Sequence, residues 1–155
     1  MRTVLFSLAA AAACTAATIA TPAYADEARA DIHGGLVWAG GDSEGTAGVA
    51  AGYDWDLGSS AFAGIEGSAD KVLVDGSDVY FGLSGRVGAK VGSKGKAYAL
   101  AGYTFGEGED SPHAGLGYEH MLGGKVYGKV EYRHYFIDDD FKDLNAAVVG
   151  VGIRF

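Results

Sequence analysis

The chain has 155 residues, a length that suits one domain. Its 26 glycines argue against long helices, where each glycine costs about 1 kcal/mol relative to alanine. Its net charge of −8 argues against a nucleic-acid partner, because phosphate binding needs clustered Lys and Arg side chains.

The first 25 residues have the features of a secretory signal peptide. Arg2 supplies a positive start, an Ala-rich apolar stretch follows, and Pro22 ends it just before Ala23-Tyr24-Ala25. Small residues at Ala23 and Ala25 are what a signal peptidase requires. We therefore expect residues 1–25 to be removed and residues 26–155 to form the mature domain.

Two alternatives for this segment fit less well. An uncleaved membrane anchor is disfavoured by the Ala-x-Ala site and by the immediate change to the polar run "DEARAD". Lipidation at Cys14 is disfavoured because "AAAC" lacks the Leu of a lipoprotein box. Beyond residue 25 the longest apolar run is "AAVVGVGI", far shorter than the roughly 20 residues of a membrane helix.

The rest of the chain alternates between apolar and polar residues with the period of two that is typical of strands. Eight segments show this pattern: 30–40, 45–56, 61–70, 78–91, 96–105, 112–122, 125–137 and 144–155. The segment 45–56 is the clearest, with Val49, Tyr53 and Trp55 on one face and Asp54 on the other. The segments 30–40 and 96–105 are poorly phased, and the second is assigned by matching its "AGY" to that of residues 51–53.

The connections between these segments alternate in kind. Three are tight ("DLGSS", "GSKGK" and "LGGK"), and four are more acidic and mostly longer ("GGDSEG", "DKVLVDGSD", "GEGEDSP" and "IDDDFKD"). Short turns at one end and longer loops at the other predict an antiparallel up-and-down meander. Eight such strands close most naturally into a β-barrel, which leaves no unpaired edge.

Alternation alone leaves open whether the apolar face points inward, as in a soluble barrel, or outward, as in a membrane barrel. The glycines favour the membrane barrel, because an eight-stranded lumen is narrow and small residues leave room for long polar ones. The polar faces carry Gly48, Gly52, Gly64, Gly82, Gly88, Gly115, Gly117, Gly150 and Gly152. On a solvated surface nothing would require so many glycines, each of which weakens a strand.

Charged residues of nearly balanced sign share these polar faces. They are Glu66, Arg86, Glu119, Lys129, Glu131, Arg133 and Arg154. Buried charges need opposite partners. We therefore predict that the seven form one inward-facing network with pairs of the Glu66–Arg86 type; the alternative is that they are ordinary surface residues of a soluble sheet.

Aromatic residues lie on the apolar faces, many of them near strand ends. They are Tyr53, Trp55, Phe81, Tyr103, Phe105, Tyr118, Tyr132, Phe136 and Phe155. Such rings favour the two membrane–water interfaces. They also fill soluble cores, but the many Ala and Gly residues here would pack a soluble interior poorly.

The terminal Phe155, preceded by Ile153 and Val151 at alternate positions, resembles the C-terminal assembly signal of bacterial outer-membrane barrels. "KVEYRHYF" and "AGIEGSAD" resemble runs of the OmpA-like and opacity-protein-like small porin family. The resemblance covers essentially all of residues 26–155. It implies an eight-stranded transmembrane β-barrel in the outer membrane, in contact with lipid and lipopolysaccharide and inserted by the barrel-assembly machinery with periplasmic chaperones. We expect a monomer without a cofactor.

No catalytic or metal site emerges from the sequence. His33, His120 and His134 have no recognisable partner motif, and His113 follows Ser111 in what reads as a loop. The acidic loop residues are oxygen ligands of the kind that Ca²⁺ and Mg²⁺ take, but their spacing is not that of an EF-hand. They are Glu107, Glu109, Asp110, Asp138, Asp139, Asp140 and Asp143. A repulsive, solvated loop surface is the simpler interpretation.

The sequence therefore predicts a non-enzymatic outer-membrane barrel with a polar, plugged lumen and a structural or surface-interaction role. Two alternatives stay open. One is a narrow pore for small solutes, because ion pairs in the lumen can exchange partners. The other is a soluble periplasmic barrel that binds an apolar ligand.

Overall fold

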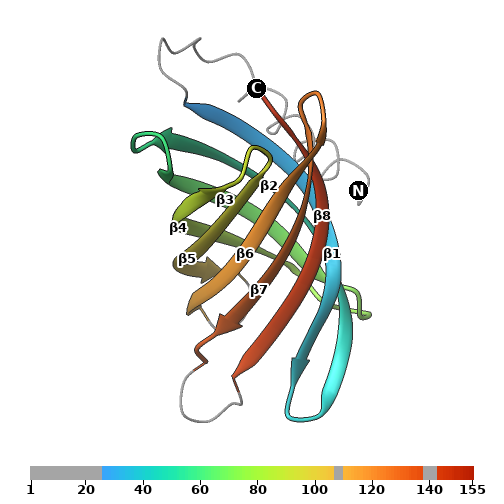
Figure 1. Cartoon of the computed structure of the whole chain (residues 1–155). Coiled ribbons are helices and arrows are strands. Elements are labelled where there is room, and N and C mark those ends of the chain that lie inside the picture. Colours follow the sequence, from blue (N-terminus) through green and yellow to red (C-terminus); the bar gives the residue numbers. More distant parts are fainter. Residues whose placement is uncertain (1–25, 107–109, 138–142) are drawn as a thin grey trace, which may run out of the picture.

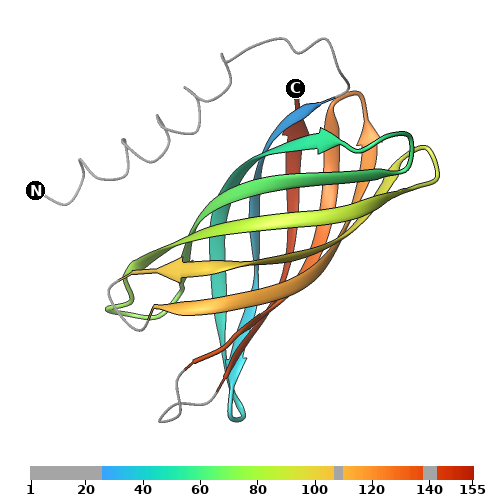
Figure 2. The ribbon, with the colours of Figure 1, turned by 90° about the vertical axis from the view of Figure 1, so that its left-hand side faces the viewer.

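The computed structural model describes residues 26–106, 110–137 and 143–155, which form a closed antiparallel barrel (Figures 1 and 2). Its strands are β1 (Glu27–Ala39), β2 (Asp42–Asp56), β3 (Ala61–Val72), β4 (Val79–Val91), β5 (Gly95–Phe105), β6 (Ser111–Gly123), β7 (Val126–Tyr135) and β8 (Leu144–Arg154). Each strand pairs with its neighbours in sequence, and β1 pairs with β8 to close the barrel. The predicted fold class and the number of strands are confirmed. Within the described ranges, no helix has the length and apolar character needed to cross a membrane.

The two ends of the barrel differ in their connections. At one end lie the short turns of residues 57–60, 92–94 and 124–125, together with the start of β1 and the end of β8 (Figure 1). At the other end the longer connections span residues 73–78, 106–110 and 136–143. In outer-membrane barrels short turns face the periplasm and longer loops face outward, so we call these the inner end and the outer end.

The first connection at the outer end is shorter than the sequence predicted. β1 and β2 continue their ladder to Ala39 and Asp42, and only Gly40 and Gly41 make the turn. Both have positive φ angles, 62° and 111°, which glycine adopts without strain. The expected loop "GGDSEG" is wrong in this respect, because Asp42, Ser43 and Glu44 belong to the strand.

Side chains alternate between the lumen and the outer surface along the strands, with one register shift in the β6–β7 ladder between Met121 and Gly123. On β2, for example, Thr46, Ala50 and Asp54 are buried, whereas Val49 and Trp55 are exposed. Large apolar side chains face outward all around the barrel, and Ile32, Leu116 and Val149 are 67%, 65% and 63% exposed. A soluble monomer rarely exposes so much contiguous apolar surface, whereas a lipid-facing wall requires it.

The two poorly phased segments find a definite register in the barrel. On β1, Arg29, Asp31, His33 and Val37 face the lumen. On β5, Lys96, Tyr98, Leu100 and Thr104 do so. The lumen thus receives some apolar residues, and that is why neither segment showed a clean polar face.

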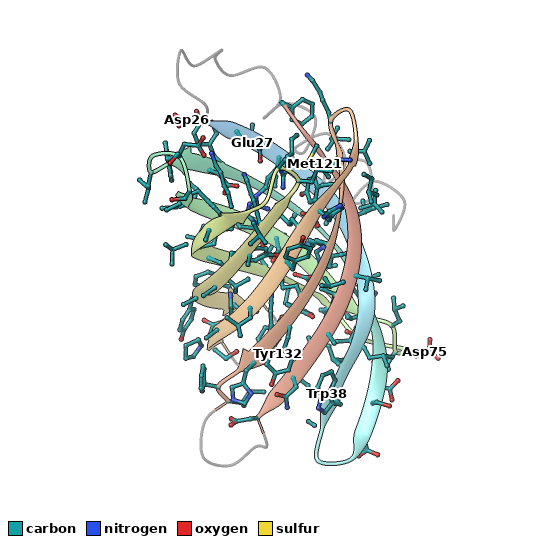
Figure 3. All side chains as sticks on the ribbon, viewed as in Figure 1. Asp26, Glu27, Trp38, Asp75, Met121 and Tyr132 are labelled. Carbon is teal, nitrogen blue, oxygen red and sulfur yellow. The ribbon has the colours of Figure 1, made fainter. Side chains whose placement is uncertain are left out.

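Aromatic side chains gather near both ends of the outer surface. Tyr53, Trp55, Tyr118 and Phe155 lie toward the inner end. Trp38, Phe81, Tyr103, Phe105, Tyr132 and Phe136 lie toward the outer end. Figure 3 labels Trp38 and Tyr132 of this outer girdle and Met121 at the opposite end. Two such girdles are typical of a wall that crosses a bilayer.

Candidate functional site: the charged lumen

All seven charged residues that the sequence placed in the lumen are buried there. Their exposed fractions run from 0% for Glu119 to 8% for Arg154. Each is on the inward face of its strand, because the period of two that turns the apolar residues to the outside turns these to the inside. The structure joins them, however, through partners that were not on that list.

Six side chains of alternating sign form a closed cycle toward the inner end, which we call the inner ring. Its contacts are Glu27–Lys96 (2.8 Å), Lys96–Asp54 (3.3 Å), Asp54–Arg86 (2.5 Å), Arg86–Glu119 (2.5 Å), Glu119–Arg154 (2.7 Å) and Arg154–Glu27 (3.1 Å). The members come from β1, β5, β2, β4, β6 and β8, so the cycle reaches across the barrel. Each charge in it has an opposite charge on either side, which offsets the cost of removing it from water.

Aromatic rings fill the space beside the inner ring. The guanidinium of Arg86 lies 4.7 Å from the centroid of Tyr98 and 5.2 Å from that of Phe62. Lys96 lies 4.8 Å from Phe62, and Arg154 lies 4.9 Å from Tyr127. A cation over an aromatic face gains further electrostatic stabilisation when both are desolvated, and Phe62 and Tyr127 are fully buried.

A second group of contacts continues from Arg29, whose Nε lies 3.6 Å from Asp54 of the inner ring. Arg29 also contacts Glu66 at 2.6 Å. Glu66 contacts Arg133 at 2.6 Å through its other oxygen, and Arg133 contacts Glu131 at 2.5 Å. A buried carboxylate with two cationic partners on separate oxygens satisfies most of its acceptor capacity.

A third group centres on Asp31, which lies 3.9 Å from Arg29. Asp31 contacts Lys129 at 2.7 Å and His33 at 2.9 Å, and it accepts a hydrogen bond from the Tyr127 hydroxyl at 3.0 Å. The second ring nitrogen of His33 lies 2.7 Å from Asp70. Together with the inner ring and the Glu66 group, these contacts make one connected set, which we call the lumen network.

The lumen network is balanced in charge, apart from Glu27, which is only partly buried. Its buried carboxylates are Asp31, Asp54, Glu66, Asp70, Glu119 and Glu131. Its buried Lys and Arg side chains are Arg29, Arg86, Lys96, Lys129, Arg133 and Arg154. Six of each sign are therefore present, with His33 between two of the carboxylates.

Sequence reasoning missed seven members of this set: Glu27, Arg29, Asp31, His33, Asp54, Asp70 and Lys96. Asp54 was recognisable, since it stands on the polar face of the clearest segment. Arg29 lay outside the predicted strand 30–40, and Asp31 and Lys96 lay in the poorly phased segments. The expected Glu66–Arg86 pairing is wrong: Glu66 pairs with Arg29 and Arg133, whereas Arg86 pairs with Asp54 and Glu119.

Glycines of the inward face mark the places where large side chains cross the lumen. A Cβ atom on Gly117 would overlap the ring of Tyr98, and one on Gly152 would overlap the ring of Tyr127. A Cβ atom on Gly52 would come within 2.6 Å of the Arg29 guanidinium. The glycine-rich polar faces therefore provide the room that the sequence analysis assigned to them.

Two of the four histidines face the lumen, and the other two lie on the outer surface. His113 is on β6 and not in a loop, and it is buried with Ser84 at 2.7 Å and Thr104 at 2.9 Å from its two ring nitrogens. His33 is on β1 and is buried between Asp31 and Asp70, so it has partners that the sequence did not reveal. His120 is exposed beside Tyr118, and His134 is partly buried on the outer surface.

Of the acidic loop residues, only Asp110 and Asp143 lie in the part of the chain that the structure describes. In that part, no group of three or more His, Cys, Asp or Glu side chains is arranged to hold a metal ion. Phe155, Ile153 and Val151 face outward, and the backbone nitrogen of Phe155 donates to the carbonyl of Ala28 at 2.9 Å. Ala23 and Ala25 fall outside the described residues.

Comparison with known structures finds the same architecture in small outer-membrane barrels. Ail, the attachment invasion locus protein of Yersinia pestis, matches with a TM-score of 0.61 at 17% identity over 85% of this chain and 99% of its own. The N-terminal β-barrel domain of Pseudomonas aeruginosa OprF matches with a TM-score of 0.60 at 12% identity over 83% and 97%. At such identities the likeness shows the fold alone.

A de novo designed transmembrane β-barrel is also similar, with a TM-score of 0.56 at 15% identity over 88% of this chain and all of the design. A comparison with curated proteins finds no match. The model of the outer membrane protein β-barrel domain, in contrast, matches residues 6–155. The chain therefore belongs to the outer membrane protein β-barrel domain family and is a protein of the outer membrane.

Proposed function

We propose that this protein is a membrane-embedded scaffold whose lumen is closed, so that it acts through its surface and not as a pore. The observation that carries the proposal is the inner ring, a cycle of alternating charges drawn from six of the eight strands. Its members hold one another across the barrel and are packed against Phe62, Tyr98 and Tyr127. Water and ions would have to separate these partners in order to pass.

A second barrier supports closure at the outer end, and we call it the apolar cap. Val37, Tyr135 and Ala146 are buried there, and Val72, Ile137 and Leu144 pack against them. Beneath the apolar cap a cavity of about 10 Å³ lies between His33, Asp70, Tyr80 and Arg133. That volume holds about one water molecule.

Conductance across a planar lipid bilayer tests this proposal. We expect the refolded protein to insert without producing conductance steps. Anomalous migration on an unheated gel shows beforehand that the protein is folded. Steady ohmic steps from the unmodified protein would overturn the proposal and support the narrow pore. The pore is the second candidate because Lys96 and Arg154 are each shared between two carboxylates, so that partner exchange needs only small movements.

The soluble periplasmic barrel is wrong, because the apolar faces point outward and the chain is an outer-membrane protein. We also infer that the protein is not an enzyme. Among the residues that the structure describes, Ser84 and His113 form a pair that resembles a nucleophile and its base, but they are only 3% and 2% exposed. The partner of the second ring nitrogen is a Thr hydroxyl, which cannot stabilise an imidazolium as a carboxylate does.

The described residues at the outer end favour contact with neutral or cationic groups. They include Asp42, Glu44, Asp75, Asp78, Asp110 and Asp143. Ail has a crystal structure in complex with sucrose octasulfate, a heparin analogue. The acidic outer end of this chain would repel such a polyanion, so a surface role here would need a different partner.

We further propose that Phe155, Ile153 and Val151 are read by the barrel-assembly machinery and its chaperones. All three face outward at the inner end, where a partner could reach them. Replacing Phe155 with Asp should lower the amount of inserted barrel in cells while leaving the unfolding of already inserted protein little changed. Insertion of F155D at the parental level would count against this role.

Export by a cleaved signal is the last part of the proposal. N-terminal sequencing of protein recovered from outer membranes should give Asp26 as the first residue. Recovery of a blocked or lipid-modified chain that begins at Cys14 would instead show that the protein is a lipoprotein.

A further inference from the structure

His33 stands on β1 in the outer half of the lumen, with a carboxylate against each of its two ring nitrogens. Its Nδ1 lies 2.9 Å from Asp31 Oδ1, and its Nε2 lies 2.7 Å from Asp70 Oδ1. The side chain of His33 is 2% exposed, and those of Asp31 and Asp70 are 0% and 9% exposed. Water therefore has little access to either contact.

The two contacts require two donors on the imidazole ring. An ionised carboxylate only accepts hydrogen bonds, and a neutral imidazole has one N–H donor and one lone pair. A neutral His33 would therefore turn its lone pair toward one of the two carboxylates at hydrogen-bond distance. A doubly protonated ring donates to both of them, and charge strengthens each of these hydrogen bonds.

The charge balance of the lumen network gives an independent reason for the second proton. Six buried carboxylates meet six Lys and Arg side chains, but Glu27 of the inner ring is a seventh carboxylate. An imidazolium at His33 is then the seventh cation, and the network is neutral. A neutral imidazole would leave one negative charge in excess in a narrow, desolvated lumen, which is costly.

The wall of the barrel provides the space for this ring. A Cβ atom on Gly48 of β2 would overlap Asp70 Oδ1 and lie 2.8 Å from His33 Nε2. A Cβ atom on Gly150 of β8 would lie 2.9 Å from His33 Cβ. Both neighbours of β1 therefore have glycine directly opposite His33, which fixes the ring between the two carboxylates.

The groups that surround His33 come from several strands. β2 and β8 present neutral residues, which are Thr46, Gly48, Val148 and Gly150. β1, β3, β4 and β7 present charged or titratable side chains, which are Asp31, Asp70, Tyr80, Lys129, Arg133 and Tyr135. The two carboxylates among them depend on His33 to different extents.

Asp31 has further partners, whereas Asp70 does not. Lys129 lies 2.7 Å from Asp31 Oδ1, and the Tyr127 hydroxyl donates to Asp31 Oδ2 at 3.0 Å. Among the residues that the structure describes, the salt-bridge contact of Asp70 is with His33 alone. Loss of the second proton of His33 would therefore release Asp70 and leave Asp31 paired.

Arg133 is the cation that shares the small cavity beneath the apolar cap with His33 and Asp70. Its guanidinium is already engaged, with Nη2 2.6 Å from Glu66 and Nε in contact with Glu131. The cavity, of about 10 Å³, has space for about one water molecule. A released Asp70 would thus find little hydration and no free cation at its side.

We infer that His33 is an imidazolium, the seventh cation of the lumen network, and that it ties β1 to β3 by holding Asp31 and Asp70 together. The tie is present while the ring keeps both protons, and rising pH breaks it by removing one of them. The inner ring contains no histidine, so loss of this proton loosens the outer half of the lumen. The inference rests on the proposed closed lumen, to which it adds what holds the outer half together.

Nuclear magnetic resonance of the refolded protein, with isotope-labelled histidine, reads the protonation of each ring directly. At about pH 7 we expect protons on both nitrogens of His33 but on only one nitrogen of His113, whose partners are the hydroxyls of Ser84 and Thr104. The signals are assigned by their loss in His33→Gln and His113→Gln. A singly protonated His33 would overturn the inference, and so would a neutral ring beside a protonated Asp70.

Unfolding by urea in detergent measures what the tie contributes. Glutamine has its donors at one atom and cannot hold both carboxylates. At about pH 7, His33→Gln should therefore raise the unfolding equilibrium constant about ten- to hundredfold, as expected for one charged hydrogen bond. At about pH 10 the difference should shrink to about threefold or less, because the parent then loses the tie as well. Equal stability at the lower pH, or a difference that is independent of pH, would overturn the inference.

Asp70→Asn tests which carboxylate is released. Asparagine has the size of aspartate but no charge, so we expect a smaller alkaline loss of stability in this variant than in the parent. For the same reason, His33→Gln combined with Asp70→Asn should be more stable than His33→Gln alone. Asp56→Asn, which removes the partly exposed partner of Lys90, is the control and should keep the pH dependence of the parent. An alkaline loss in Asp70→Asn as large as that of the parent would contradict the tie.

Bilayer conductance of the same preparations separates this inference from the closed lumen. Conductance steps from a protein whose His33 is doubly protonated would overturn the closed lumen and leave the tie in place. A singly protonated His33 in a protein without conductance steps would overturn the tie and leave the closed lumen in place.

Discussion

The inner and outer parts of the lumen are closed by different chemistry. Toward the inner end, the inner ring holds charges of alternating sign with aromatic rings packed against them. Toward the outer end, Ser84, Thr104 and His113 bond through neutral groups, and the apolar cap of Val37, Tyr135 and Ala146 lies near the mouth. The same narrow barrel thus contains a network of paired charges, which extends from the inner ring to His33 and Asp70 in the outer part, and beside it a smaller group of weaker, uncharged contacts.

This difference predicts where the removal of one side chain should reduce the stability of the barrel most. A buried charge that loses its partner retains its full desolvation cost. A hydroxyl that loses its partner gives up much less, because a neutral hydrogen bond contributes only about 0.5–1.5 kcal/mol net. The inner ring should therefore dominate the stability of the barrel, although the outer contacts also close the lumen.

The largest effect is expected at the centre of the inner ring. Arg86→Ala removes the guanidinium that joins Asp54 to Glu119. If the site is dry, the free energy of unfolding should fall by about 3–5 kcal/mol, and by much less if water enters. Equilibrium unfolding of the refolded protein in detergent measures this loss.

Lys90→Ala is the matched control for this variant. Lys90 pairs with Asp56 at 2.6 Å, but its side chain is 29% exposed. Such a pair contributes about 0–1 kcal/mol. Equal losses in the two variants would mean that Arg86 is as well solvated as Lys90, and the inner ring would then not be a barrier. The same two variants, compared in planar bilayers, show whether breaking the ring also opens a conducting path.

The sequence predicted the faces of the wall well but the pairs within it poorly. Alternation is a local property, so Arg86, Glu119 and Arg154 could be assigned to the lumen from their own strands. The partner of each charge depends on the shear of the barrel and on side-chain length, which bring β2 and β6 to the two sides of Arg86. Neither quantity can be read from one strand.

The contacts of His113 with Ser84 and Thr104 were missed for a different reason. Pro112 stands between Ser111 and His113 and made "SPH" look like a loop. Proline is tolerated here because Tyr103, its partner on β5, and Phe136, whose nitrogen donates to its carbonyl, lie at the edge of the ladder. His113 is thereby the first lumen residue of β6 after Ser111, and its partners Ser84 and Thr104 come from two other strands.

A smaller effect is expected from crowding next to the inner ring. Gly117→Ala would place a methyl group in the Tyr98 ring, which is held by a hydrogen bond of 2.6 Å to Glu131 and by its contact with Arg86. Overpacking of this kind costs about 1–3 kcal/mol. A Cβ atom on Gly82, in the outer part, would overlap Ser68 Oγ at 2.7 Å, which can rotate away, and would make an ordinary contact with His113 at 3.8 Å, so Gly82→Ala should cost less.

An outward glycine distinguishes crowding from a general loss of glycine. A Cβ atom on Gly128 would lie 3.6 Å from Leu122, an ordinary contact. Gly128→Ala should therefore leave the midpoint of unfolding unchanged or raise it slightly. Equal losses of stability in all three glycine variants would contradict this explanation, because they would show that Gly117 is not needed to make room for the Tyr98 ring.

The smallest effect is expected from Ser84→Ala. This change removes one hydroxyl partner of His113 and leaves the second, Thr104, in place at 2.9 Å. Because all the groups involved are neutral, the free energy of unfolding should fall by about 1 kcal/mol, the cost of one buried hydrogen bond.

The Ser84→Ala and Arg86→Ala variants change neighbouring inward positions of the same strand, so their difference compares the two chemistries with the backbone held constant. Equilibrium unfolding of both variants shows which of the two kinds of contact contributes more to the stability of the barrel. A loss at Ser84 as large as that at Arg86 would show that the outer contacts, and not the charged ring, govern the stability of the closed lumen.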